Sequence, residues 1–248
     1  MNKFFDEYNE VGYFKIKNFL EKNEVSKIEL ELEKCLKNKG ILKYKDKNGK
    51  IRRIEKIYDK GKFLKQFDLN VKKLLKKIFQ KKYSIFKDKL NIKPPGGEGF
   101  FAHYDGIFKF KNKNNKILNG WYEYSDNFIN ILLAINSCNK KNGTIELAKA
   151  TDGNFYNLLK NTNKDGSPNL KKSYESKLNF KHIDLEVGDI IIFSNKCPHR
   201  SKKNKSNKNR KTLYYTYTIS KSMNLYKKYF LDKVSSKNKN SKSLTGEI

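Results

Sequence analysis

Two segments in the first third of the chain carry apolar residues at the three- and four-residue spacing of an amphipathic helix. The first helix is predicted over residues 23–39, where the apolar positions are Val25, Ile28, Leu32, Cys35 and Leu36. The second is predicted over residues 64–80, where they are Phe67, Val71, Leu74, Leu75 and Ile78. Gly40 is expected to cap the end of the first helix. Between the helices, residues 44–53 predict a polar hairpin that turns at Asn48-Gly49, a strong turn signal.

From residue 83 onward the pattern changes to short segments that favour β-structure. Strands are predicted over residues 84–93, 128–136, 144–147, 180–185, 190–193 and 211–220, with a further short one within residues 9–20. The segment 128–136 is the most apolar and is expected at the centre of a sheet. Residues 151–174 predict a long insertion with one helical turn, of the kind that often forms a lid or a binding loop. Many strands after two helices predict a mainly β sandwich or barrel with flanking helices.

The composition is that of a folded protein without a membrane span. A chain of 248 residues with 37% hydrophobic and 13% aromatic residues is enough for one domain of barrel size. It contains no run of eighteen apolar residues, and its first residues lack the apolar segment of a signal peptide. The three cysteines, Cys35, Cys138 and Cys197, are odd in number and far apart, so we expect free thiols in a reducing cytoplasm.

The formal net charge of +29 allows two interpretations. One is binding to nucleic acid or to another anionic surface. The other is a compositional preference for lysine and asparagine. Lysine is spread almost evenly, while arginine occurs only as Arg52, Arg53, Arg200 and Arg210, and proteins that read bases usually favour arginine. The compositional interpretation is therefore favoured and a nucleic-acid partner is not expected, although a basic surface could draw an anionic small molecule towards a pocket.

Two of the three histidines stand in contexts that suit metal ligands. His103 and Asp105 are two residues apart, and alternate residues of an extended strand point to the same side. His199 comes shortly after an apolar strand. Two imidazoles and one carboxylate that leave other coordination positions open form the facial triad of non-haem Fe(II) oxygenases. The third histidine, His182, lies in an alternating charged strand and is expected at the surface.

A hydroxyl and a guanidinium follow the second candidate histidine. Ser201 lies two residues after His199 and Arg210 eleven residues after it, with polar residues 202–209 between them. If those residues form a loop, the strand 211–220 returns Arg210 alongside His199. Arginine binds carboxylates through a bidentate charged fork. This set is what a dicarboxylate co-substrate such as 2-oxoglutarate needs beside a metal ion.

Taken in order, these motifs resemble the phytanoyl-CoA dioxygenase (PhyH-like) family of Fe(II)/2-oxoglutarate oxygenases over residues 9–232. The most specific part is Val187-Gly188-Asp189 before an apolar strand, followed by Pro198-His199-Arg200-Ser201 and by Arg210. Residues 12–20, 86–97 and 143–147 are also similar to family segments.

The resemblance implies a fold and a set of cofactors. The core would be a double-stranded β-helix, a jelly roll of the cupin type. His103, Asp105 and His199 would hold Fe(II), and 2-oxoglutarate and O2 would be co-substrates. Arg210 and Ser201 would bind 2-oxoglutarate, with Asn91 close by. Residues 1–232 are expected to form a single domain of this kind, and residues 233–248 a flexible tail.

A narrower resemblance concerns the substrate. Residues 87–97, 198–201 and 226–233 look like the branch that contains 2-aminoethylphosphonate dioxygenases. The chain departs from the family at Tyr104, where glutamine is frequent. An anionic substrate would be met by residues on the strand 84–93 or beside the metal ligands. The candidates are Lys87, Lys89, Lys93, Tyr104 and Arg200.

Two alternatives stay open at the level of sequence. The same chemistry could act on another small metabolite, on a protein or on a nucleic acid, with the lysines as a docking surface. The chain could also be a non-catalytic basic protein that binds nucleic acid, in which case the His-x-Asp pair is incidental.

Overall fold

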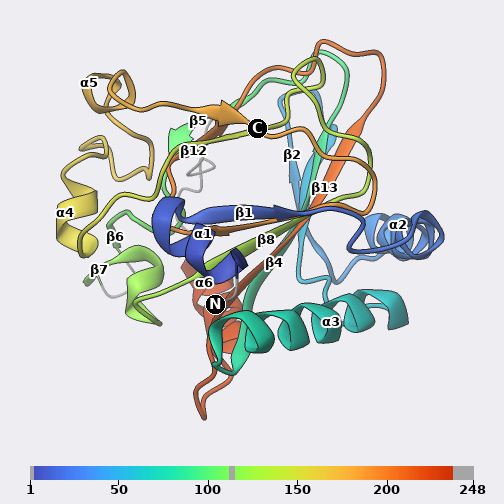
Figure 1. Cartoon of the computed structure of the whole chain (residues 1–248), viewed down its shortest axis with the longest axis horizontal. Helices are drawn as coiled ribbons and strands as arrows, with labels where there is room; N and C mark the ends of the chain where they lie inside the picture. The colour runs from blue at the N-terminus through green and yellow to red at the C-terminus, as the bar shows by residue number, and fades with distance from the viewer. Residues whose placement is uncertain (1–2, 112–114, 237–248) are drawn as a thin grey trace.

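The computed structural model describes residues 3–111 and 115–236, and its framework is a pair of antiparallel sheets (Figure 1). In spatial order, the larger sheet consists of β1 (Tyr13–Ile16), β11 (Ile190–Ser194), β8 (Ile129–Ala134), β13 (Arg210–Ile219), β4 (Tyr83–Lys93), β3 (Ile51–Glu55) and β2 (Leu42–Lys45). The smaller sheet consists of β10 (Lys181–His182), β9 (Ile145–Leu147), β12 (His199–Ser201) and β5 (Phe100–His103). Every pair of neighbouring strands in these two sheets is antiparallel.

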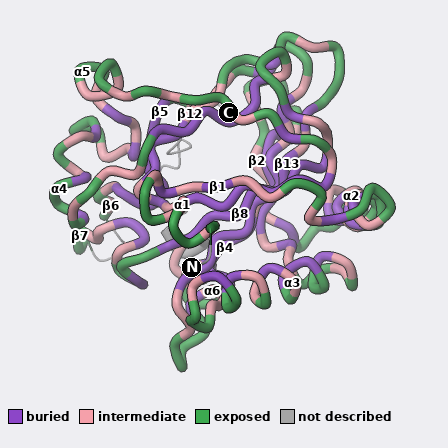
Figure 2. The backbone as a smooth tube through the Cα atoms, viewed as in Figure 1, coloured by how far each residue is buried: buried purple, intermediate pink, exposed green. Residues whose placement is uncertain are grey.

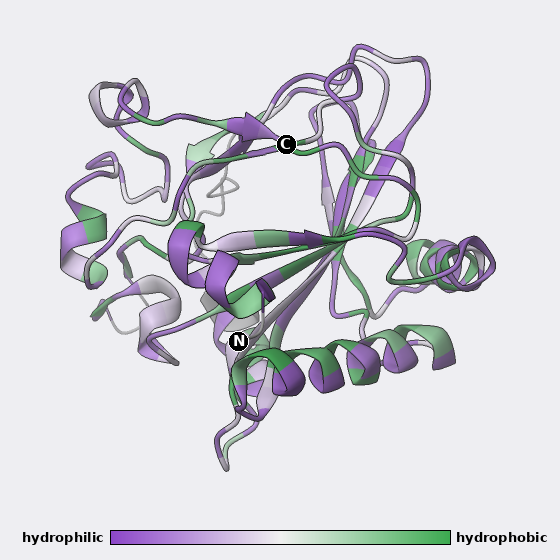
Figure 3. Cartoon of the chain, in the orientation of Figure 1, coloured by the Kyte–Doolittle hydropathy of each residue, from purple (hydrophilic) through white to green (hydrophobic). Residues whose placement is uncertain are grey.

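Helices cover one face of the larger sheet. α2 (Lys22–Lys37) and α3 (Lys62–Phe79) bury the apolar positions that the sequence places on one side of each helix. Figure 3 shows α3 with apolar residues along the side that meets the sheet and polar residues along the other. The apolar residues of α2 and α3 pack against strand residues that include Leu90, Leu133 and Leu213. This cluster is the main hydrophobic core, and burial of its apolar surface is the principal stabilising contribution to the fold.

The opposite face of the larger sheet looks towards the smaller sheet. A second cluster lies there, formed by Leu132, Ala134, Leu147, Ile191 and Phe193. Figure 2 shows the strands of both sheets as mostly buried and the outer sides of the helices as exposed. All six residues of β8 are buried. Its side chains point alternately to the two faces of the sheet, and both faces are covered by a hydrophobic layer, so the strand can be apolar along almost its whole length.

On β4 the same alternation brings polar side chains inside. Leu90 faces the helices, so Lys89 and Asn91 face the smaller sheet. Directly opposed residues in an antiparallel pair share a face. Tyr214 opposes Lys89, and Arg53 opposes Asn91. The space between the sheets is therefore apolar at the β8 end and strongly polar at the β3–β4 end.

The 151–174 insertion is attached to the smaller sheet. It contains α4 (Phe155–Leu159) and the start of α5 (Lys172–Glu175). Leu170 donates a backbone hydrogen bond to Ala102 of β5 at 2.7 Å, and Tyr104 donates one to Pro168 at 3.3 Å. The insertion is thus a second neighbour of β5, on the side that β12 leaves free.

The remaining elements are short or terminal. They are α1 (Lys3–Val11), β6 (Phe110–Lys111), β7 (Ile117–Leu118), a 3-10 turn (Gly120–Glu123) and α6 (Leu225–Ser236). Because α6 runs through Ser236, the predicted tail is wrong for residues 233–236, and Lys233 bonds to the buried Glu55. Residues 237–248 of that tail lie outside the described residues. No helix in the described ranges is long and apolar enough to cross a membrane.

Two further expectations have clear outcomes. The predicted helices and the hairpin are confirmed to within two residues. Gly40 is not the helix cap: α2 ends at Lys37, Asn38 is extended, and the Asn38 side chain accepts a hydrogen bond from the Gly40 N–H.

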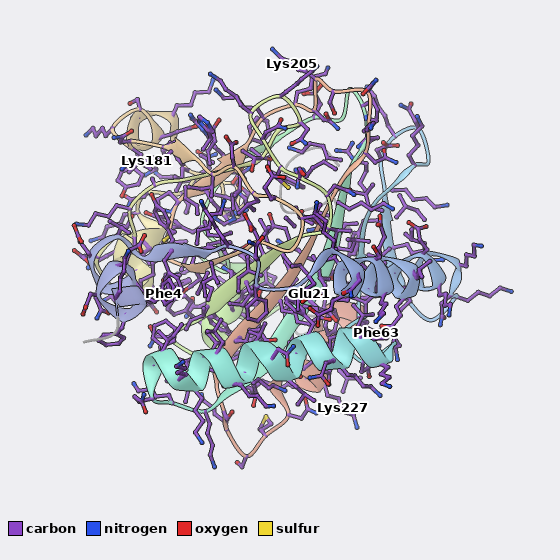
Figure 4. The ribbon with its side chains drawn as sticks, turned by 45° about the vertical axis from the view of Figure 1, so that its right-hand side comes forward. Phe4, Glu21, Phe63, Lys181, Lys205 and Lys227 are labelled. Atoms are coloured by element: carbon purple, nitrogen blue, oxygen red, sulfur yellow. The ribbon has the colours of Figure 1, made fainter. Side chains whose placement is uncertain are left out.

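The lysines that Figure 4 labels, Lys181, Lys205 and Lys227, lie at the periphery of the molecule.

Candidate metal centre

Cross-strand pairing brings the three candidate ligands together. His103 ends β5, and His199 opens β12 directly opposite it. Asp105 follows β5 by two residues. His199 Nε2 lies 3.7 Å from Asp105 Oδ2, and one ligand atom from each of the three residues lies within 4.8 Å of the others. All three side chains are buried, with exposures of 5–6%.

Backbone carbonyls orient both imidazoles. His103 Nδ1 lies 2.7 Å from the carbonyl oxygen of Phe101, and His199 Nδ1 lies 3.1 Å from that of Cys197. A carbonyl oxygen can only accept, so each Nδ1 carries the proton and each Nε2 keeps its lone pair. Burial lowers the pKa of His103 to about 3 and lowers that of His199 as well. Both rings are therefore neutral, which is the form that binds a metal ion.

The carboxylate of the set is held in its charged form. Burial acts to raise the pKa of Asp105, but the nearby Lys89 and the two histidines outweigh it, so the pKa lies below its ordinary value. Asn195 donates a hydrogen bond to the Asp105 backbone oxygen at 3.3 Å, which fixes the segment that carries the carboxylate. Two neutral imidazoles and one carboxylate on one side of a buried site fit Fe(II) with open positions.

Arg210 lies in the same cavity with part of its guanidinium unused. It is 3% exposed, donates to Thr212 Oγ1 at 2.8 Å and to the Gly143 oxygen at 3.1 Å. Its Nε is buried and has no hydrogen-bond partner among the described residues. A buried charged donor without a partner is costly, so this atom indicates an anionic ligand.

Ser201 and Lys93 lie beside this arginine. Ser201 Oγ accepts hydrogen bonds from Lys93 Nζ at 2.8 Å and from the Phe100 N–H at 3.2 Å. With both lone pairs used, the Ser201 hydroxyl proton can be donated to a ligand. Lys93 Nζ also donates to the oxygens of Gly143 and Lys202. Burial, followed by the charge of Arg210, lowers the pKa of Lys93 to about 6.

One cavity joins these groups. Its empty volume, which includes the solvent at its mouth, is about 480 Å³. The residues that line it are Arg53, Lys89, Asn91, Phe100, His103, Ile145, His199, Arg200, Ser201, Arg210 and Tyr214. The structure thus brings together most of the residues that the sequence singled out: the ligands, the arginine and serine beside them, and Asn91. The Asn91 Oδ1 is buried and accepts no hydrogen bond from the residues that the structure describes.

Comparison with known proteins agrees with this geometry. The family model described as phytanoyl-CoA dioxygenase (PhyH) matches residues 8–212. The chain belongs to the phytanoyl-CoA dioxygenase family. The family predicted from the motifs is thereby confirmed, and the match includes every candidate ligand and Arg210.

Two relatives of this family member have phosphonates in their names. A methylphosphonate hydroxylase from Gimesia maris is 28% identical over 149 residues, covering 60% of this chain and 50% of the relative. A 2-aminoethylphosphonate dioxygenase from the uncultured bacterium HF130_AEPn_1 is 24% identical over 185 residues, covering 73% of this chain and 64% of the relative. The chain spans between half and two thirds of the length of these relatives.

Solved structures confirm the predicted jelly-roll fold of this PhyH family member. The α-ketoglutarate-dependent carbocyclase SnoK from nogalamycin biosynthesis superposes with a TM-score of 0.69 at 12% identity, covering 99% of this chain and 95% of its own. EctD from S. alaskensis with bound Fe superposes with a TM-score of 0.67 at 14% identity, covering 88% of this chain and 76% of its own.

Two charged residues that were expected to meet the substrate, Arg200 and Lys87, have other partners in the PhyH domain. The Arg200 guanidinium binds Glu146 and Glu175, both at 2.7 Å, because it points away from the two inward residues that flank it on β12. Lys87 lies 3.6 Å from Glu55 and 5.3 Å from the Trp121 ring centroid. These lysine and arginine charges already have partners, so neither is presented freely to a ligand.

Tyr104 contacts residues of the 151–174 insertion. Its ring is fully buried, and its hydroxyl donates to Thr151 at 2.7 Å and contacts Tyr174 at 3.3 Å. It lies between two ligands in sequence but points to the opposite side of the strand, so the expectation that it lines the substrate pocket is wrong. Its contacts are with residues that no local pattern connects to it.

Arg53 is the residue that the sequence analysis did not select. It reaches the cavity because β3 pairs with β4 and places it opposite Asn91. Its guanidinium lies over the Tyr44 ring at 4.6 Å, and its Nε is buried without a hydrogen-bond partner in the described part of the chain. The scarcity of arginine is the only signal that could have drawn attention to it, since the register of β3 is not readable from sequence.

Proposed function

We propose that this PhyH family member is an Fe(II)- and 2-oxoglutarate-dependent dioxygenase that hydroxylates a small anionic substrate. The observation that carries the proposal is the buried triad, in which both Nε2 atoms are free of protons, one ligand atom from each residue lies within 4.8 Å of the others, and both histidines line the cavity. A non-catalytic basic protein, the alternative from sequence, would have no reason to bury these three side chains around a shared point.

Each residue of the site has a role under this proposal. His103, Asp105 and His199 would hold the metal ion. Bound Fe(II) would supply the oxidation, in which O2 and 2-oxoglutarate yield succinate, CO2 and one oxygen atom for a substrate C–H bond. Arg210 would bind the distal carboxylate of 2-oxoglutarate through its open Nε edge, and Ser201 would donate its hydroxyl proton to the same group.

Organophosphonates are the first candidates for the substrate. The two curated relatives carry phosphonates in their names at 24–28% identity. The cavity is basic, and Lys89 lies in it next to the metal ligands. Burial lowers the pKa of Lys89 to about 8, with Asp105 acting against that shift, so at neutral pH it remains largely a cation.

Anaerobic titration with Fe(II) and 2-oxoglutarate tests the reaction class. We expect a weak visible absorption band that the wild type and His182→Ala both form, since His182 is exposed on β10, and that His199→Ala does not form. Oxygen is then admitted with 2-aminoethylphosphonate or methylphosphonate, and succinate is measured. A wild-type protein that gives no band with both ligands present contradicts the proposal.

A further inference from the structure

The inner face of β3, β4 and β13 carries more positive charge than the iron site alone explains. The basic side chains on this face are Arg53, Lys87, Lys89, Lys93 and Arg210. Lys93 is left out of the excess because its pKa is lowered, and the other four remain cations. The buried carboxylates near them are Glu55 and Asp105. A divalent metal ion and a dianionic co-substrate cancel each other, so the proposed cofactors leave this excess unchanged. Buried charge of one sign is unfavourable unless a counter-ion is bound.

Three of these basic residues have another partner or an assigned ligand. Lys87 lies 3.6 Å from Glu55 and is not among the residues that line the cavity. Lys93 donates to Gly143, Lys202 and Ser201. Arg210 lies near Ser201, where 2-oxoglutarate is proposed to bind. Arg53, although it also lies 3.8 Å from Glu55, and Lys89 both line the cavity.

Arg53 and Lys89 are neighbours on the inner face. Arg53 opposes Asn91 across β3 and β4, and Lys89 is two residues before Asn91 on the same face. Arg53 is 7% exposed, and its Nε has no hydrogen-bond partner in the described part of the chain. Its closest carboxylate oxygen, on Glu55, is 3.8 Å away, beyond hydrogen-bond distance. Lys89 is packed over the Tyr214 ring, with its Nζ 4.7 Å from the centroid.

We propose that Arg53 and Lys89 form the recognition site for a dianionic oxyacid head group, phosphonate or phosphate, on the organic substrate. This inference rests on the proposed function and assigns it a specificity determinant. The planar guanidinium presents two parallel donors to two oxygens of such a group, and the ammonium adds a point charge for a third. A carboxylate or a sulfonate, with one negative charge, would leave part of the excess uncompensated.

The arrangement separates two anions within one cavity. Arg210 and Ser201, on β13 and β12, would bind the co-substrate, and Arg53 and Lys89, on β3 and β4, would bind the head group. His103 and His199 line the same cavity. The carbon next to the head group is then the part of the substrate that is carried towards the metal ligands.

The test is ligand binding to the anaerobic complex with Fe(II) and 2-oxoglutarate, followed through the shift of its visible band and by calorimetry. The probes are methylphosphonate, methyl phosphate and methanesulfonate. Arg53→Gln and Lys89→Gln are compared with Arg52→Gln. Arg52 is the matched control, because it is the adjacent arginine of β3, is equally buried, and donates from its Nε to the Ile92 oxygen at 3.0 Å.

We expect Arg53→Gln to weaken methylphosphonate binding by about tenfold or more, as loss of a charge-assisted pair does. Arg52→Gln should stay within about twofold of wild type, and the 2-oxoglutarate affinity of Arg53→Gln should also be unchanged within about twofold. Arg53→Lys, which keeps the charge and loses the fork, should fall between wild type and Arg53→Gln. The affinities of wild type for methyl phosphate and for methylphosphonate are then compared, and the tighter of the two identifies the head group as a phosphate ester or a phosphonate.

Two results would overturn the assignment. One is that Arg53→Gln and Lys89→Gln bind methylphosphonate as tightly as wild type. The other is that wild type forms the band with Fe(II) and 2-oxoglutarate but binds neither dianion more tightly than methanesulfonate; the proposed function then stands and this inference fails. Absence of the band in wild type instead refutes the proposed function itself.

Discussion

His199 lies directly opposite His103 in the antiparallel pair of β12 and β5, and the centroids of their rings are 4.1 Å apart. A single cross-strand pair thus supplies two of the three candidate ligands from positions 96 residues apart in sequence. A one-residue slip of β12 would move His199 to the other face of the sheet.

Metal binding should stabilise the protein. A divalent ion that binds only the folded chain raises its unfolding free energy by about 2.7 kcal/mol at one hundred times the dissociation constant. We expect Co(II), used as an air-stable probe, to raise the melting temperature of wild type and of His182→Ala. His103→Ala and Asp105→Ala should show no such rise. A chelator should reverse the effect, and equal shifts in all four proteins would contradict the site.

The metal-free protein should lose stability on acidification through the histidine range. The folded pKa of His103 is about 3, below the 6.5 of an unfolded histidine. Between these values the unfolded chain binds more protons, so stability falls as pH decreases from 6.5 towards 3. Urea unfolding of wild type and His103→Gln across this range should show a smaller pH slope for the variant. Parallel slopes would mean that His103 titrates normally in the folded state.

Replacement of Arg210 should specifically weaken the binding of 2-oxoglutarate. Arg210→Lys keeps a positive charge but loses the planar fork, so we expect the dissociation constant of 2-oxoglutarate to rise by about tenfold or more. Arg200→Gln is the control, since its guanidinium is already held by Glu146 and Glu175. That variant should keep its 2-oxoglutarate affinity. A comparable loss in both variants would indicate a general electrostatic effect instead of a defined contact.

Removal of the Tyr104 hydroxyl should loosen the insertion. The group donates to Thr151 in a buried site, and a net loss of about 1 kcal/mol in the unfolding free energy is expected for Tyr104→Phe. Tyr156→Phe is the matched control, because Tyr156 belongs to the same insertion and is 57% exposed. Limited proteolysis should cut residues 151–174 faster in Tyr104→Phe. Equal stability and cleavage in the two variants would refute the anchoring role.

Much of this architecture follows from patterns within the sequence. The periodicity of α2 and α3 reflects burial on one side, which is a local property of each helix. Short spacings along the chain predict two halves of the site separately, His103 with Asp105 and His199 with Arg210. The family resemblance is what joins these two halves into one site. The alternation of β4 also predicts that Lys89 points to the face opposite Leu90. The strand alone does not show whether that face meets solvent or a second sheet.

The remaining features depend on contacts between distant segments. Arg53 reaches the cavity through the register of β3 against β4, and Tyr104 is fixed by Thr151, 47 residues away. Lys87 and Lys89 look equivalent in sequence, yet only Lys87 meets Glu55. Residue type alone predicts Gly40 as a cap, while the backbone N–H of Asn38 bonds to the Cys35 oxygen at the end of α2. In each case the decisive partner is set by packing rather than by neighbours along the chain.

The backbone contact between the 151–174 insertion and β5 has a consequence for solubility. β5 is the terminal strand of the smaller sheet, and residues 168–170 occupy the hydrogen-bonding groups on its outer side. An uncovered terminal strand is a template for association with strands of other molecules. The insertion therefore shields from self-association the strand that carries His103, and a shortened chain without it would be prone to aggregate before its chemistry could be assayed.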